Sequence, residues 1–149
     1  MNYLPVQQNR IKKVNVFKYL GEWVNINGNE NISLEKRAVK MGNAFKNTRS
    51  IYNKKALSWG TRIKHFETVI KPEALYGAET LKIKLKGSIN KIIAIERKIV
   101  RNILGPRKNE TQYNRPRTNK EIYSKVENII HTMRKRRLMF FRHIARIYF

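Results

Sequence analysis

Apolar side chains recur at intervals of three, four and seven residues along most of the chain after residue 30, and this spacing indicates a mainly α-helical fold. The successive apolar stripes contain Leu34, Ala38, Met41, Phe45 and Tyr52; Trp59, Ile63, Phe66 and Ile70; Ile89, Ile92, Ile93, Val100 and Ile103; and Ile122, Val126, Ile129 and Ile130. A last amphipathic segment covers residues 131–147. We therefore expect a helical domain over residues 31–149, built as a bundle of about five amphipathic helices.

Helix boundaries are marked by small polar residues, glycine and proline. Ser33, Ser58 and Asn119 are suitable N-caps, and Gly87 with Ser88 breaks the chain before the third stripe. We expect Pro72 to end or kink the second helix, and the helix to resume and continue to about residue 84. Residues 105–118 are polar and basic with two prolines, so they are expected to form a mobile loop.

Residues 1–30 follow a different pattern and are expected to form a separate N-terminal β-hairpin. Over residues 11–26 the apolar residues alternate, with Val14, Val16, Leu20, Val24 and Ile26 on one face and Phe17, Tyr19 and Trp23 on the other. Gly21 is a candidate bulge, and residues 27–28 (Asn-Gly) are a turn signal that ends the run. The expected fold class is mainly α, with this hairpin preceding the helices.

The composition excludes several kinds of catalytic site. The 149 residues include 33 Lys and Arg but only 10 acidic residues, all of them Glu, which gives a net charge of +23. With no Asp and no Cys, the chain lacks the Asp cluster typical of two-metal nucleotidyl transfer, an Asp-based triad and a Cys-ligated zinc site. His65, His131 and His143 lie far apart in the sequence. We expect a protein that is not an enzyme on its own and holds no cofactor and no metal.

The positive charge indicates a polyanionic partner. Hydrophobic residues make up 41% of the chain, enough for a packed core, so the charge belongs to a folded module rather than to a disordered tail. Nucleic acid is the expected partner, and an anionic membrane surface is the lesser alternative. The candidate nucleic-acid-binding residues are Lys12, Lys13 and Lys18, which lie among aromatic residues of the hairpin, and Lys135, Arg136, Arg142, His143 and Arg146, which form the basic side of the last helix.

Two further features concern location and membrane contact. The start of the chain lacks the charged and apolar regions of a signal peptide, and no apolar run approaches the ~18 residues needed to span a bilayer. We expect an intracellular protein, in the nucleus or the cytoplasm. Leu138, Phe141 and Ile144 lie opposite the basic side of the last helix, an arrangement that would also suit adsorption to anionic lipid.

Glu96 falls in the middle of the strongest apolar stripe. A carboxylate at such a position must be paired or hydrogen-bonded, because burying it alone would cost several kcal/mol. We expect a structural ion pair or hydrogen bond, with Arg37 or Tyr76 as candidate partners. A catalytic role is the alternative, which a single isolated carboxylate supports poorly.

Six sequence blocks, in collinear order, resemble the region that follows the polymerase palm in reverse transcriptases of non-LTR (LINE-like) retrotransposons. They are residues 17–21 (FKYLG), 37–45 (RAVKMGNAF), 76–80 (YGAET), 96–105 (ERKIVRNILG), 117–123 (RTNKEIY) and 137–146 (RLMFFRHIAR). Two positions depart from the family pattern, since Leu81 replaces the usual Trp and Arg142 replaces Gly. The blocks make Arg37, Tyr76, Gly77, Glu79 and Glu96 candidate structural residues.

The resemblance implies a fragment of an endonuclease–reverse transcriptase: a primer-grip-side hairpin followed by a thumb-like helical domain that holds the template–primer duplex with weak sequence preference. The resemblance implies that the palm with its metal-binding Asp motif lies upstream of this region and is missing here, and it makes a palm-containing polymerase chain a further candidate partner. A polymerase subunit acting in trans, a repurposed basic adaptor for RNA, DNA or membrane, and an unselected retroelement remnant are the alternatives.

Overall fold

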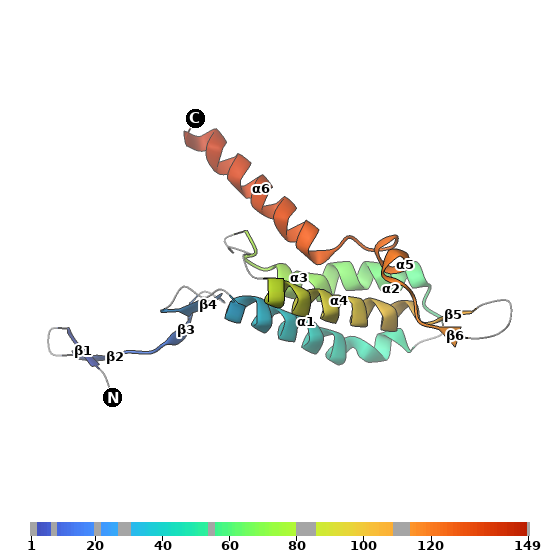
Figure 1. The fold of residues 1–149 in the computed structure, drawn as a ribbon, viewed down its shortest axis with the longest axis horizontal. Helices are drawn as coiled ribbons and strands as arrows, with labels where there is room; N and C mark the ends of the chain where they lie inside the picture. Colours follow the sequence, from blue (N-terminus) through green and yellow to red (C-terminus); the bar gives the residue numbers. More distant parts are fainter. Residues whose placement is uncertain are drawn as a thin grey trace.

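Helices α1 (Asn31–Tyr52) and α4 (Lys86–Leu104) lie side by side and form the centre of the molecule (Figure 1). This computed structural model describes residues 3–6, 9–19, 22–26, 31–53, 56–79, 86–108 and 114–148. The two helices run in the same direction, and near their first turns Lys91 Nζ lies 2.6 Å from Glu35 Oε1. Their facing apolar stripes explain the packing, because burial removes both stripes from water.

The apolar stripes of the sequence form the observed core, and this prediction is confirmed for most members. The buried large side chains include Met41, Phe66, Ile70, Ile92, Val100, Ile103, Ile122 and Ile129 from the predicted stripes, together with Met133. Trp59 is the exception, since 57% of it is exposed and Lys125 Nζ lies 4.9 Å from its ring centroid. Trp59 is the first residue of its helix and reaches outward, so its placement on the apolar side was wrong.

The second helical stretch continues through Pro72 instead of ending there. Helix α2 (Trp59–His65) passes into a π-helical turn, η1 (Phe66–Ile70), and then into α3 (Lys71–Leu75). In the wider turn the backbone N–H of Lys71 donates to the carbonyl of Phe66, five residues earlier. Such a turn suits a proline at the start of α3, because proline has no N–H to donate.

Beyond α3 the expected helix to about residue 84 is wrong for the residues that the structure describes. Residues 76–79 form turns, and Gly77 has a φ of 60°, a left-handed conformation that glycine adopts without steric cost. Residues 80–85, including Leu81, lie outside the described residues.

The N-terminal segment forms two hairpins rather than one ribbon over residues 11–26. Strand β1 (Tyr3–Val6) pairs with β2 (Asn9–Lys12), and β3 (Val16–Tyr19) pairs with β4 (Glu22–Asn25), both antiparallel. Because Phe17 pairs with Val24, these two share a face, which corrects the expected grouping of Val24 with Val16. Gly21 and residues 27–28 lie outside the described residues.

Three of the expected helix starts differ in the structure. Ser33 and Ser88 are buried within α1 and α4, which begin two residues before them. Ser58 does cap α2, since its Oγ accepts a hydrogen bond from the backbone N–H of Thr61 (3.1 Å). Thr118, not Asn119, caps α5 (Asn119–Tyr123), through a reciprocal capping box with Glu121.

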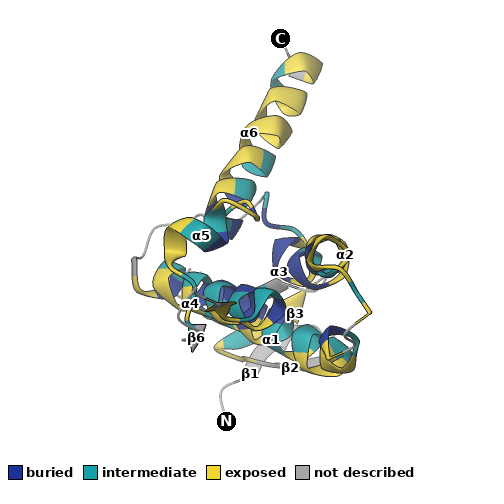
Figure 2. Ribbon diagram, turned by 90° about the vertical axis from the view of Figure 1, so that its right-hand side faces the viewer, coloured by how far each residue is buried: buried dark blue, intermediate teal, exposed yellow. Residues whose placement is uncertain are grey.

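The last helix, α6 (Ile129–Tyr148), begins after a break at residues 124–128, so Ile129 and Ile130 belong to α6 rather than to the preceding helix. Its first turns pack against α3 and α4, and the rest projects away from the body (Figures 1 and 2). A third two-stranded pair, β5 (Arg107–Lys108) with β6 (Asn114–Arg115), connects α4 to α5. The predicted fold class, mainly α with an N-terminal hairpin before the helices, is confirmed.

Candidate nucleic-acid interface

Helix α6 carries the densest group of predicted binding residues. Its sequence holds six Lys and Arg residues, together with His131 and His143, and no acidic residue. Lys135, Arg142 and Arg146 recur at intervals of seven and four residues, so they lie along one side of the helix. All three are exposed, as is His143 on the adjoining side. The helix therefore presents a row of cations to solvent.

Arg136 is held closer to the body than the other predicted residues of α6. It is half-buried, and its Nη1 lies 3.9 Å from Glu79 Oε1 in the turn after α3. At this distance, between two partly exposed side chains, the ion pair contributes little to stability.

The same turn contains most of the predicted structural residues. Arg37, buried in α1, donates through Nη1 to the carbonyls of Ala74 (3.1 Å) and Tyr76. Burial lowers the pKa of Arg37 to about 10, while the charge of Glu79 acts in the opposite direction. Gly77 reverses the chain here, and the side chain of Tyr76 is exposed. Arg37 thus links α1 to the end of α3 through backbone carbonyls, which gives these residues a structural function.

Glu96 has different partners from those expected. It is fully buried in α4, and its Oε1 accepts from the backbone N–H of Ile129 (2.9 Å) while its Oε2 accepts from Tyr123 Oη (3.2 Å). The predicted pairing with Arg37 or Tyr76 is wrong, because those residues meet each other at the end of α3. Burial raises the pKa of Glu96 to about 7, against the opposing effects of Lys71, of both hydrogen bonds and of Arg97.

Lys71 complements Glu96 at the base of α6. It is buried, and its Nζ donates to the carbonyl of Glu127 at 2.6 Å. Burial lowers the pKa of Lys71, and the charge of Glu96 is the first of the effects that oppose this shift. Together the two side chains bind the backbone at the start of α6, at the carbonyl of Glu127 and at the N–H of Ile129. We assign Glu96 a structural role: it fixes where α6 leaves the body.

The predicted residues of the hairpins form a second group, separate from α6. Lys13 and Lys18 are exposed, and the side chain of Lys12 lies outside the described residues. Phe17 and Tyr19 are 47% and 62% exposed, with ring centroids 6.5 Å apart. On the other face of this hairpin, Lys36 Nζ lies 5.0 Å from the ring centroid of Trp23, where β4 meets α1. The hairpins leave the body in a different direction from α6 (Figure 1).

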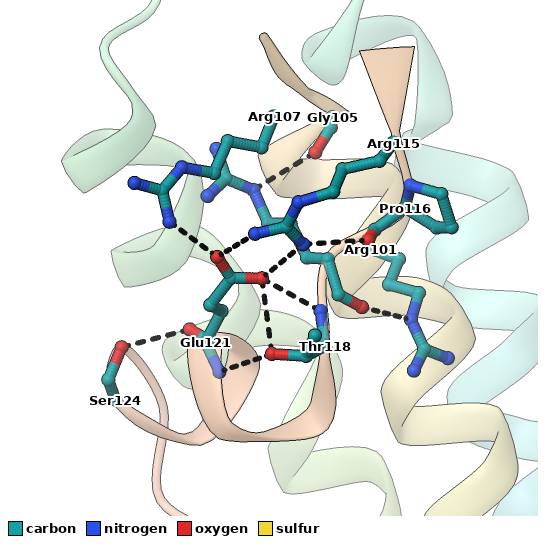
Figure 3. Close-up of polar contacts among 9 residues, drawn as sticks. Arg101, Gly105, Arg107, Arg115, Pro116, Thr118, Glu121 and Ser124 are labelled. Atoms are coloured by element: carbon teal, nitrogen blue, oxygen red, sulfur yellow. Dashed lines mark hydrogen bonds and ion pairs between the residues drawn. The ribbon is translucent and has the colours of Figure 1, made fainter. Parts of the chain in front are cut away.

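Glu121 organises the described ends of the basic 105–118 segment (Figure 3). Its carboxylate accepts from Arg107 Nη1 (2.7 Å), from both Nη atoms of Arg115 (2.9 and 3.1 Å) and from the backbone N–H of Thr118 (2.8 Å). These bonds hold the pKa of Glu121 well below its usual range. Arg117 Nε also donates to the carbonyl of Gly105 (3.0 Å). Residues 109–113 lie outside the described residues, and mobility of the segment stays a prediction.

Sequence reasoning missed an open groove of about 410 Å³ between α1 and α4. Its apolar part and its polar rim come from both helices. The lining residues are Ala38, Val39, Gly42, Asn43, Phe45, Lys46 and Arg49 from α1, and Ile95, Lys98, Ile99 and Asn102 from α4. Gly42 was a signal in the sequence. Glycine inside a long helix destabilises that helix, so its presence there suggests a need for space beside the backbone.

No protein-family model, curated protein or solved structure matches this chain. Among the described residues, no group of three or more His, Cys, Asp and Glu side chains could hold a metal ion. Within the same residues, no helix combines the length and the apolar character that crossing a membrane requires.

Proposed function

We propose that this chain is a nucleic-acid-binding module that contacts phosphates mainly through α6. The observation that carries the proposal is a projecting helix with six Lys and Arg residues, no acidic residue, and most of its length exposed. Cations on an exposed helix neutralise phosphates and release counterions, which gives affinity without sequence readout. The exposed Phe17 and Tyr19 offer a second contact area, with Lys18 on the opposite face of the same strand.

The resemblance to non-LTR reverse transcriptases supports a more specific form of this proposal. In that form the chain is a thumb-like fragment that holds template–primer, acts with a palm-containing partner inside the cell, and has no polymerase activity alone. The absence of Asp from the sequence supports this last point, since the metal-binding carboxylates of such polymerases are Asp. Incubation with primer–template, dNTPs and Mg²⁺ should give no extension, and extension that survives repurification would contradict the proposal.

A salt series tests phosphate binding by α6. The double variant Arg142→Gln/Arg146→Gln should reduce the slope of log K against log salt for a duplex by roughly 2, since each lost phosphate contact removes about 0.9. The matched control, Lys64→Gln/Lys120→Gln, removes two exposed cations from α2 and α5 and should change the slope little. Equal slopes for both variants would show that α6 is not the contact surface. Affinity that does not depend on salt would contradict nucleic-acid binding itself.

An anionic membrane surface is a second candidate, favoured by one observation. Leu138 and Phe141 are each 70% exposed on the projecting part of α6, on the same helix as its cations. Such a helix can lie in the interface of anionic lipid, with its apolar side inserted. Co-sedimentation with phosphatidylserine vesicles that persists in the presence of competing RNA would favour the membrane, whereas displacement by RNA would favour nucleic acid.

A further inference from the structure

The groove between α1 and α4 contains a glycine that has no packing role. Gly42 lies in the middle of the 22-residue helix α1, and a Cβ added there would meet no atom within 4 Å. Glycine inside a helix lowers stability relative to alanine, so a close approach of another segment usually explains it. At Gly42 no described atom makes such an approach. Because Gly42 has no side chain, the groove wall is open at this position.

The chemistry around that space is of three kinds. The floor is apolar, formed by Ala38 and Ile99 with the partly buried Phe45. The cations Lys46, Arg49 and Lys98 stand exposed at the rim. Two exposed amides, Asn43 and Asn102, also line the groove, and Asn102 Nδ2 donates to the carbonyl of Lys98 (2.7 Å), which leaves its Oδ1 as an acceptor for a ligand.

We propose that this groove binds one unpaired nucleotide of a single strand, with the base on the apolar floor and the phosphates at the three cations. Charge complementarity favours an anion, because the groove is lined by three cations and no carboxylate. The amides favour a base over an acyl chain, since only a base offers hydrogen-bonding edges there. The volume of about 410 Å³ is typical of sites for single small ligands. This inference rests on the proposed nucleic-acid binding and adds a preference for unpaired strands.

Filling the groove tests the inference without removing charge. Fluorescence anisotropy would compare an unstructured labelled oligoribonucleotide of about ten nucleotides with a duplex of the same length. Gly42→Phe should weaken single-strand binding about tenfold, the scale of losing one stacked base, and leave duplex binding within about twofold. Gly42→Ala is the matched control for helix propensity: it should raise the melting temperature and change single-strand affinity far less than Gly42→Phe.

Charge variants provide a second readout, which remains valid even if the Gly42→Phe variant does not fold. Lys98→Gln in the groove should weaken single-strand binding more than Lys64→Gln, which removes one exposed cation from α2. If the wild-type protein binds both probes but neither Gly42→Phe nor Lys98→Gln reduces single-strand affinity selectively, the groove proposal is wrong and nucleic-acid binding stands. If the wild-type protein binds neither probe, the proposed function itself fails, and the groove proposal with it.

Discussion

Helices α4 and α6 have similar sequence patterns and opposite surroundings. Each is amphipathic, with apolar residues at helical spacing beside several cations. In α4 the apolar side is covered by α1, α2 and α5, and Ile92 and Val100 are fully buried. In α6 only the first turns are covered, and Leu138 and Phe141 remain 70% exposed. The pattern identifies which side of a helix is apolar, but the elements that pack against the helix in space decide whether that side is buried.

A truncation in α4 should have the largest effect. Ile92→Ala should lower the free energy of unfolding by about 3 kcal/mol, since it removes buried methyl groups and leaves a cavity between packed helices. Ile92→Val, which removes one methylene, should cost about 1 kcal/mol. Urea denaturation monitored by circular dichroism measures both. A loss of less than 1 kcal/mol for Ile92→Ala would contradict the central position of α4.

The buried carboxylate of α4 gives the next effect, and it depends on pH. Burial raises the pKa of Glu96 to about 7 from its ordinary value of about 4.5, so the folded state holds this proton more tightly than the unfolded state does. The contribution of Glu96 to stability is therefore complete below about pH 4.5 and is lost as the pH rises to about 7. The shift corresponds to a loss on the order of 3 kcal/mol.

Glu96→Gln removes this titration and isolates it. The difference in unfolding free energy between variant and wild type should move in favour of the variant by about 2.5 kcal/mol between pH 5 and pH 8, most of the full shift. Other groups with shifted pKa values, such as Glu121, cancel in that difference because both proteins contain them. Urea titrations at the two pH values measure the change. A difference that does not vary with pH would contradict the elevated pKa.

The capping box before α5 should contribute less than either feature of α4. Thr118→Ala removes the acceptor for the backbone N–H of Glu121 and a hydrogen bond to its carboxylate. The expected cost is about 1 kcal/mol, typical of a lost N-cap, and Thr118→Ser should be close to neutral because it retains the hydroxyl. Thermal melts of both variants would show whether the segment leading into α6 is stabilised locally or only through Glu96 and Lys71.

The sequence predicts the helical part of this molecule better than its joints. Spacing identified the buried stripes of α1 and α4, because a helix with one apolar side packs with that side toward the core. The two-residue connection between β3 and β4 was not visible in the alternation, so Val24 was placed on the wrong face. The capping box was visible as Thr118 followed three residues later by Glu121, but Asn119 next to it matched the N-cap preference equally well.

Candidate site residues divide in the same way. Helical spacing alone placed Lys135, Arg142 and Arg146 on one side of α6, but it did not predict that the helix projects from the body or that Arg136 is half-buried. The partners of Glu96 could not be deduced, because a backbone N–H at Ile129 and a hydroxyl at Tyr123 meet it only after α5 and α6 have folded back onto α4. The groove needed the relative position of α1 and α4. Only Gly42 pointed to it, through a helix position where glycine is unfavourable.

The smallest expected effect tests the exposed side of α6 directly. Leu138→Ser should change the free energy of unfolding by less than about 0.5 kcal/mol, because the side chain is already 70% exposed in the folded state and unfolding exposes little more apolar surface. The control within the same helix is Met133→Ala, a residue with no exposed surface, which should cost about 2 kcal/mol or more. Urea denaturation at two protein concentrations measures both variants. A large loss of stability for Leu138→Ser that depends on protein concentration would mean that a second copy covers α6 in solution. The difference between the buried apolar side of α4 and the exposed apolar side of α6 would then apply only to the monomer.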